Sequence, residues 1–364
     1  MDNSKLNRRT FLSTAALATT AAVATSSAAS GQVVQRIQQD VQRMQQERRQ
    51  IVANQRQGGG PAAPQASAFG TLAPAPVDQR ARARLRIASQ IRGWIPGSND
   101  AERMRQMKAW GMEGVEPGGG VANDHNRARE YKRMADDAGL EVCAVTWGAG
   151  GGAAVSGNPE EVQRGIDAIK RALEGAAILG ANGIVYVPAF NGDQSRINRT
   201  HQEIRRALID IDPRTKEIRG GFLKEVGDFA ASLGTSIILE PLNRMEAMFL
   251  RQVADGAAIC QDAQSEGVKV MGDFYHMFFE ETCDMGAFIS AGNYLKHVHL
   301  GSGNRRIMPG QDPAQSFVAG FRGLKFIGYD QFMSFECGVD GGDERGAEIL
   351  PQVIDFLQRS WDVA

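Results

Sequence analysis

The chain has 364 residues, of which 42% are hydrophobic and 23% are charged, and its formal net charge at pH 7 is −1. This composition is typical of a soluble globular protein with enough apolar material for a large core. The near-neutral charge argues against nucleic acid or an anionic membrane as a partner, because both attract a strongly basic surface.

Residues 1–30 have the features of an export signal rather than of a folded domain. Asn7-Arg-Arg-Thr-Phe-Leu-Ser13 resembles the twin-arginine motif, and an uncharged Ala/Thr-rich segment follows it as far as Ala29. This segment is short for a membrane span and ends in small residues, with Ser27-Ala-Ala29 as a candidate cleavage site. We therefore expect a twin-arginine signal peptide, recognition by the twin-arginine export machinery and a periplasmic location. An uncleaved anchor and an ordinary cytoplasmic tail are the alternatives.

Residues 31–57 and 58–80 predict a helix and a linker ahead of the main domain. Apolar residues from Val34 to Ile51 recur at alternating spacings of three and four, and the remaining positions are mostly Gln and Arg. This pattern predicts an amphipathic helix, which we expect to be exposed, with self-association into a homo-oligomer as the alternative. Gly58-Gly-Gly-Pro opens a Pro/Ala-rich stretch that predicts a flexible linker, so the folded domain should occupy residues 81–364.

From residue 81 onward, strand-like and helix-like segments alternate strictly. Glycines just past the helical segments are typical of helix C-terminal caps. Eight such alternations predict an α/β fold of the (β/α)8 TIM barrel type, and no glycine-rich phosphate turn follows the first strand to favour a doubly wound sheet. The expected strands are 85–91, 114–116, 141–146, 183–187, 236–239, 268–272, 295–298 and 331–335. The expected helices are 100–110, 126–138, 159–179, 216–233, 252–265, 284–291, 313–326 and 344–359.

The last four expected strands each end in a side chain that can bind a metal ion. The apolar runs that start at Ser236, Val268, Leu295 and Gln331 end in Glu, Asp, His and Glu, respectively. Because the carboxyl ends of barrel strands meet at one face, these groups should lie close together. Three carboxylates and one imidazole favour Mn²⁺ or Mg²⁺, with Co²⁺ or Zn²⁺ as alternatives. The predicted ligands are Glu240, Asp273, His299 and Glu336; four unrelated surface groups would be the alternative reading.

The motifs around these positions resemble those of a known superfamily. They are Glu240-Pro-Leu-Asn-Arg, Asp273-Phe-Tyr-His276, His297-Val-His299 with Asn304-Arg305 and Pro309-Gly310, and Phe335-Glu336-Cys-Gly338. In this order they resemble the xylose isomerase-like TIM barrels, and within that superfamily the ketose 3-epimerases and hydroxypyruvate isomerases, over residues 86–359.

The resemblance implies roles for specific residues. It implies metal ligation by the four strand-end groups and substrate contacts from Glu246, His276 and Arg305, which follow three of those groups at the family's spacing. The family's substrate contacts on the second and third strands do not align with this chain, so the resemblance leaves the substrate open.

Several residues keep two interpretations. Trp94, Glu116 and Trp147 fall at the ends of the first three strands, and Trp147 could stack on a sugar face or simply pack. His297 points inward but deeper than His299, so we expect a core or supporting histidine rather than a substrate contact. The excursion from 191 to 214 is long enough for a lid or an oligomer contact.

The expected activity is isomerisation or epimerisation of a keto-sugar or a small hydroxy-ketone. Glu240 and Glu336 would be the catalytic residues: one removes a proton beside the carbonyl and the other returns it, through a metal-stabilised enediolate. A lyase or dehydratase acting on an oxidised (3-keto) sugar, and a non-catalytic sugar-binding barrel, are the alternatives. A three-zinc DNA-repair site is not expected, because the whole chain has five histidines.

Overall fold

The computed structural model describes residues 81–148, 151–193, 197, 199–303 and 305–364. The expected signal peptide, amphipathic helix and linker lie outside the described residues and stay predictions. Within the described part, no helix is both long enough and apolar enough to cross a membrane.

The strands form a parallel barrel, as the sequence predicts. They are hydrogen-bonded in the order β3-β2-β1-β13-β12-β11-β9-β5-β4. The two ends of this order, β3 (Glu141–Val142) and β4 (Val145–Thr146), are halves of one barrel strand interrupted at Cys143-Ala144, so the sheet returns to its starting point. The other strands are β1 (Arg86–Gln90), β2 (Gly114–Glu116), β5 (Ile184–Tyr186), β9 (Ile237–Leu239), β11 (Val268–Asp273), β12 (Leu295–Leu300) and β13 (Phe332–Phe335).

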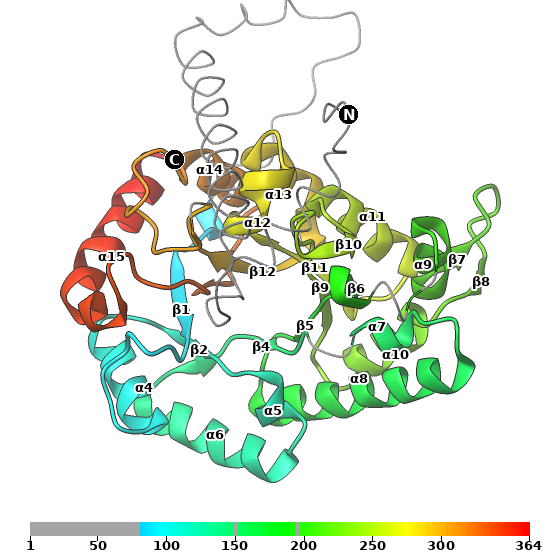
Figure 1. Cartoon of the computed structure of the whole chain (residues 1–364), viewed down its shortest axis with the longest axis horizontal. Coiled ribbons are helices and arrows are strands. Elements are labelled where there is room, and N and C mark those ends of the chain that lie inside the picture. The colour runs from blue at the N-terminus through cyan, green and yellow to red at the C-terminus, as the bar shows by residue number, and fades with distance from the viewer. Residues whose placement is uncertain (1–80, 149–150, 194–196, 198, 304) are drawn as a thin grey trace, which may run out of the picture. The chain divides into compact units, whose positions relative to one another are not determined.

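Helices surround the strands (Figure 1). The helix α8 (Pro159–Leu179) shows why they form: the Asn158 side chain caps its first turn, Pro159 follows, and Gly180 ends it at φ 68°. The outer helices that follow the barrel strands in turn are α4 (Asp100–Ala109), α6 (His125–Ala138), α8, α10 (Leu223–Ser232), α11 (Val253–Ala263), α13 (Asp284–Ala291), α14 (Val318–Phe326) and α15 (Gly346–Asp362). The loops add α5 (Gly119–Ala122), α7 (Gly151–Ala154), α9 (His201–Leu208) and α12 (Phe274–Glu280), with 3-10 turns η1 (Asn191–Asp193), η2 (Gly292–Tyr294) and η3 (Asp343–Arg345).

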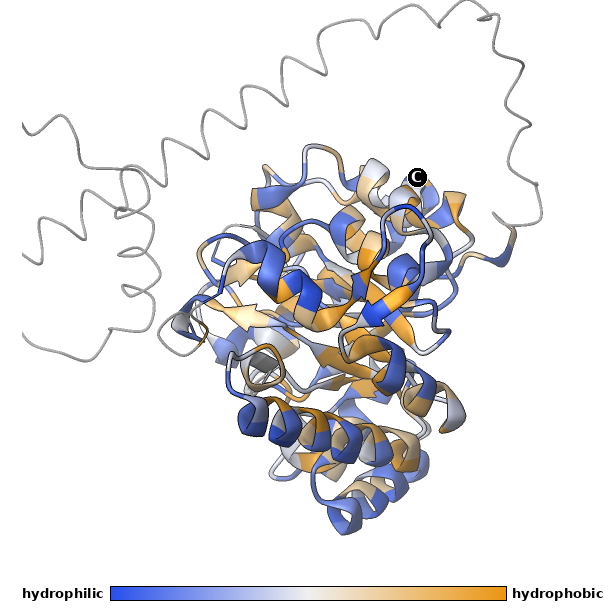
Figure 2. Ribbon diagram, turned by 90° about the vertical axis from the view of Figure 1, so that its right-hand side faces the viewer, coloured by the Kyte–Doolittle hydropathy of each residue, from blue (hydrophilic) through white to orange (hydrophobic). Residues whose placement is uncertain are grey.

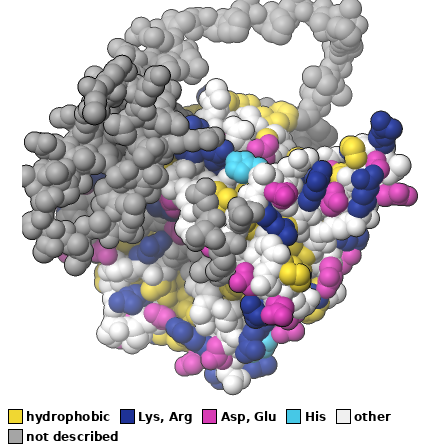
Figure 3. Space-filling view, turned by 45° about the vertical axis from the view of Figure 1, so that its right-hand side comes forward, with side chains coloured by type: hydrophobic (Ala, Val, Ile, Leu, Met, Phe, Trp, Pro, Cys, Tyr) yellow, Lys and Arg dark blue, Asp and Glu magenta, His cyan; other side chains and the backbone are white. Residues whose placement is uncertain are grey.

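The core has two layers, because parallel strands are covered on both faces. The larger layer lies between strands and helices, and Figure 2 shows the apolar strands inside helices whose hydrophilic residues lie on their outer faces. A smaller cluster lies inside the barrel, where each neighbouring strand contributes one side chain. It consists of Ala144, Val185, Ile238 and Met271. On the face drawn in Figure 3, acidic and basic side chains are intermingled, in line with the near-zero net charge.

The helix expected over 216–233 starts later than the sequence pattern suggests. Residues 210–220 form an antiparallel hairpin of β7 (Asp210–Ile211) and β8 (Ile218–Gly220), and α10 begins at Leu223. The Asp212 carboxylate accepts hydrogen bonds from the backbone of Arg214 and Thr215, which favours a turn over a helix. The helix expected to begin at residue 313 likewise begins at Val318.

A second antiparallel pair connects two loops at the mouth of the barrel. β6 (Ala189–Phe190) pairs with β10 (Ala247–Phe249). The Asn191 side chain donates a hydrogen bond to the Arg244 carbonyl oxygen at 3.1 Å, so the loops that follow β5 and β9 are held together.

Candidate metal centre and active site

The four strand-end groups predicted from the sequence meet at one place. Glu240, Asp273, His299 and Glu336, called here the ligand group, each offer one donor atom within 4.8 Å of the others. The Nδ1 atom of His299 lies 2.7 Å from Glu336 Oε2, 3.6 Å from Glu240 Oε1 and 3.8 Å from Asp273 Oδ2. Asp273 and His299 lie on β11 and β12, and the two glutamates directly follow β9 and β13, so all four come from the carboxyl ends of barrel strands.

The donor set fits a divalent cation. Among the described residues, His299 Nδ1 is a buried nitrogen that lacks a hydrogen bond of normal geometry. It faces three carboxylates, and burying like charges together is unfavourable unless a cation lies between them. Oxygen-rich ligation with a single nitrogen suits Mn²⁺ or Mg²⁺.

Crowding of the carboxylates shifts their pKa values apart. Burial raises the pKa of Glu240 to about 7, and the charges of Glu336 and Asp273 act in the same direction. Burial alone would also raise the pKa of Glu336, but His299 and Arg306 hold it well below its usual value. Burial opposes the charged form of His299, yet the carboxylates of Glu116 and Glu336 raise its pKa well above the ordinary value. Without a cation, the ligand group therefore retains protons at neutral pH.

Uptake of Mn²⁺ by the metal-free protein is expected to tighten as the pH rises from about 6 to about 8, by up to roughly tenfold per pH unit for each proton that the cation displaces. Glu240 and His299 both have raised pKa values, so each holds a proton that a cation must displace. Calorimetric titrations in buffers of different ionisation enthalpy would measure the protons released. Binding that releases no proton and has the same affinity across this range would contradict the expectation.

The guanidinium that reaches the ligand group belongs to Arg306, not to the expected Arg305. Arg306 Nη2 lies 2.7 Å from Asp273 Oδ2 and also pairs with the Glu336 carboxylate, while its Nε donates to the Glu336 carbonyl oxygen at 2.8 Å. The Arg305 side chain is 62% exposed and pairs with Asp340 at 2.8 Å. The two arginines both have left-handed backbone conformations, with φ values of 60° and 51°, and their side chains have different partners, Asp340 for Arg305 and Asp273 for Arg306.

The two other expected substrate contacts lie beside the ligand group and share one partner. The backbone N–H of Asn243 donates to His276 Nδ1 at 3.1 Å, which leaves the hydrogen of the neutral ring on Nε2, 3.5 Å from Asp273 Oδ2. Asn243 Nδ2 is 2.9 Å from the same His276 nitrogen and donates to Glu246 Oε1 at 3.1 Å. Burial and the charge of Arg306 lower the pKa of His276 well below its usual value, so it stays neutral.

Trp147 is packed into the wall of the barrel. Its ring stacks on Tyr186 with centroids 6.3 Å apart, and its indole N–H donates to Asn123 at 3.1 Å. Both contacts favour the packing interpretation of Trp147. Trp94 is also buried, with its N–H bonded to the Cys337 carbonyl oxygen.

Glu116, whose role the sequence left open, lies behind His299. It is the last residue of β2, is fully buried, and its Oε1 lies 3.0 Å from His299 Nε2 while its Oε2 lies 3.2 Å from His297 Nε2. His297 is thus a buried supporting histidine. Glu116, His297 and Cys143 also have donor atoms within 4.8 Å of one another. Burial and the charge of Glu116 raise the pKa of the Cys143 thiol well above its usual value, so this thiol stays protonated and the cluster is better suited to hydrogen bonding than to a second cation.

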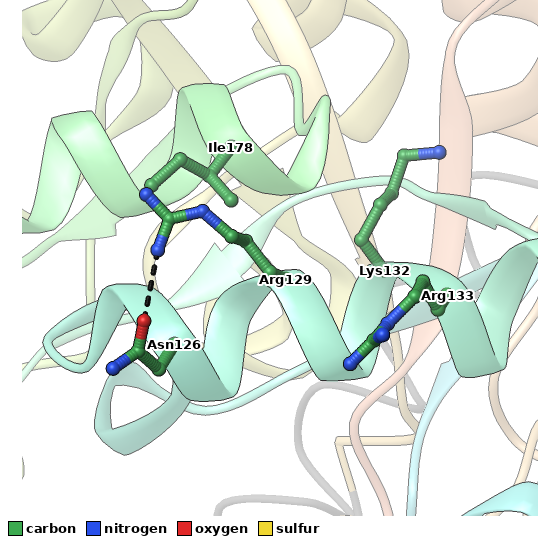
Figure 4. A pocket seen from close by; sticks show the side chains of 5 residues that line it. All are labelled: Asn126, Arg129, Lys132, Arg133 and Ile178. Atoms are coloured by element: carbon green, nitrogen blue, oxygen red, sulfur yellow. Dashed lines mark hydrogen bonds between the residues drawn. The ribbon is translucent and has the colours of Figure 1, made fainter.

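A surface pocket lies between α6 and α8 (Figure 4), and no member of the ligand group lines it. Arg129 bonds there to Asn126 at 3.0 Å. The pocket lies on the outer helices rather than at the strand ends. Its lining residues are Asn126, Arg129, Lys132, Arg133 and Ile178.

A barrel with a carboxylate–imidazole centre at its strand ends defines a class of TIM-barrel proteins, and comparison with known proteins identifies the family. The family model described as "Xylose isomerase-like TIM barrel" matches residues 104–360, so the chain belongs to the xylose isomerase-like TIM barrel family. Its matched relatives are epimerases, and the protein is an enzyme of the isomerase class.

Individual relatives and structures agree with this assignment. The 3-dehydro-D-guloside 4-epimerase of Escherichia coli K12 is 30% identical over 261 residues, covering 71% of this chain and 94% of that protein. The D-psicose 3-epimerase of Agrobacterium fabrum is 36% identical over 124 residues, which cover 34% of this chain and 42% of that one. The crystal structure of an E. coli 3-keto-D-glucoside 4-epimerase has a TM-score of 0.63 at 26% identity, covering 76% of this chain and 100% of that one. The D-psicose 3-epimerase structure from Clostridium cellulolyticum H10, with a TM-score of 0.64 at 20% identity and coverage of 76% and 99%, shares the fold.

Proposed function

We propose that this enzyme epimerises a keto-sugar at a carbon next to the carbonyl, with Glu240 and Glu336 carrying the proton and a divalent cation held in the ligand group. The observation that carries the proposal is the pair of carboxylates that face one imidazole nitrogen, with oxygens 3.6 and 2.7 Å from His299 Nδ1. β11 and β12 separate β9 from β13 around the barrel, so the two carboxylates approach the site from different directions.

Two carboxylates in this arrangement can invert a carbon. One glutamate removes the proton from one face of the sugar, and the other, in its acid form, returns a proton to the opposite face. The pKa of Glu240 is raised and that of Glu336 is lowered, and this difference favours one residue acting as the acid while the other acts as the base. A bound divalent cation would supply Lewis-acid polarisation of the carbonyl and the neighbouring hydroxyl.

The surrounding side chains would orient the sugar and offset its developing charge. Arg306 brings a fixed positive charge beside Asp273, where negative charge on a substrate oxygen would be stabilised. Neutral His276 offers an N–H donor, and the Glu246 carboxylate accepts a hydrogen bond from Asn243 and has further acceptor capacity for a hydroxyl group.

For the substrate class, we propose a glycoside oxidised to a ketone on the sugar ring, with free ketoses second. The support is that the 3-dehydro-D-guloside 4-epimerase matches this chain along 94% of its own length, whereas the D-psicose relative from Agrobacterium matches along 42%.

Incubation in deuterated water with 3-keto-glycosides and with free ketoses tests the proposal. We expect NMR to show deuterium entering a carbon next to the carbonyl together with the inverted isomer. Chelation should stop this exchange and added Mn²⁺ should restore it. Release of the aglycone with no epimer would indicate a lyase instead, and no deuterium uptake from either sugar class would overturn the proposal.

A further inference from the structure

Glu116 is a buried charge that the proposed reaction does not use. It contacts His299 at Nε2, while Nδ1 of the same ring faces the ligand group. The two ring nitrogens point away from each other, so Glu116 acts on the ligand group through the imidazole rather than beside it.

The contact indicates which nitrogen of His299 keeps its hydrogen once a cation displaces the proton from Nδ1. An ionised carboxylate accepts hydrogen bonds and donates none, so the nitrogen that faces Glu116 must be the protonated one. The two oxygens of Glu116 face three groups that can donate a hydrogen bond, His297 Nε2, His299 Nε2 and Thr146 Oγ1, and such a set of donors suits an ionised carboxylate. The neutral form of His299 then leaves a lone pair on Nδ1. Metal-binding histidines commonly donate their other N–H to a carboxylate in this way.

We propose that Glu116 is a positioning residue, which fixes His299 as the Nε2–H tautomer and thereby presents Nδ1 to a divalent cation. The inference rests on the cation of the proposed function and deepens it.

Further hydrogen bonds hold the Glu116 carboxylate and lead back to a second ligand. Thr146 Oγ1 donates to Glu116 Oε1 at 2.6 Å, and Gln90 Nε2 donates to Thr146 Oγ1 at 2.8 Å. Arg92 donates to Gln90 Oε1 and lies 3.7 Å from Glu336 Oε1. The first half of the barrel, which holds none of the four predicted ligands, thus supports two of them through side chains from β1, β2 and β4 and the loop after β1.

Metal affinity provides the first test. Gln has nearly the same shape as Glu, but its amide can accept a hydrogen bond from one histidine only and presents an N–H donor to the other. In the Glu116→Gln variant the affinity for Mn²⁺ should therefore fall about 10–100-fold. Glu113→Gln is the matched control, because Glu113 precedes the same strand and pairs with Arg86 at 2.9 Å, away from His299; its affinity should equal that of the wild type. A wild-type protein that binds no Mn²⁺ would defeat the proposed function, whereas Glu116→Gln binding as tightly as the wild type would overturn only this inference.

The tautomer itself provides a second test, which the wild-type protein alone can decide. In protein labelled with ¹⁵N-histidine, titration with the diamagnetic ions Mg²⁺ or Zn²⁺ should shift the Nδ1 resonance of one imidazole whose Nε2 keeps its proton. The Glu116→Gln protein should lose this fixed Nε2–H signal. If the variant does not fold, the wild-type spectrum decides alone: a ligand imidazole protonated on Nδ1 and bound through Nε2 would overturn the inference.

Discussion

Epimerisation should fall by roughly 10²–10⁴-fold in both Glu240→Gln and Glu336→Gln, because each substitution removes one of the two proton carriers. Each residue also belongs to the ligand group, so the metal content of both variants must be measured at saturating Mn²⁺. With metal retained, residual deuterium exchange should be confined to one epimer of the substrate in each variant, and to opposite epimers in the two variants. The remaining carboxylate faces only one side of the carbon.

The control for these variants is Glu266→Gln, whose side chain is 96% exposed in the loop before β11. It should epimerise at the wild-type rate and so show that loss of a negative charge is not itself responsible. A near-normal rate in either site variant would contradict the two-carboxylate mechanism.

Arg306→Ala should lose about 10²–10³-fold in kcat/KM, since it removes a fixed positive charge from the place where negative charge develops. Arg305→Ala should change kcat/KM by no more than about threefold, because an exposed ion pair contributes little. Arg306→Lys should recover only part of the loss, since a lysine cannot bond to a carboxylate through one nitrogen and to a carbonyl through another.

These adjacent arginines form a matched pair, with equal charge and nearly equal backbone conformation. Steady-state kinetics with the sugar identified by deuterium exchange would compare them. Loss of activity in Arg305→Ala with normal activity in Arg306→Ala would mean that the sequence spacing, and not the turn seen here, identifies the residue that contacts the substrate.

Much of the fold follows from local pattern. Short apolar strands, capped helices and glycines past the helix ends determine the alternation and hence the barrel. The break between β3 and β4 is not visible in the sequence, because Cys143 and Ala144 continue an apolar run. The turn of the hairpin at 210–220 has a sequence signal in Asp212-Pro213, but its second strand, Ile218–Gly220, is too short to be distinguished from the start of the helix that follows.

The candidate site, like the fold, could be predicted from the sequence only in part. The ligand group could be predicted because each member ends a strand, and strand ends converge whatever the loops do. Arg306 could not be distinguished from Arg305, because a loop does not fix the side to which a side chain points. Glu116 could not be given a role, because its partners His297 and His299 are 181 and 183 residues away in the chain. That pairing exists only once the barrel closes.

Asn243 links His276 and Glu246, the two side chains that we propose contact the sugar. One amide holds both His276 and Glu246, and a backbone hydrogen bond from the same residue fixes the histidine ring. Exchanging His276 alone, to direct the enzyme toward another carbohydrate, would leave the Asn243 amide with Glu246 as its one remaining partner of the two, so His276 and Asn243 are best varied together.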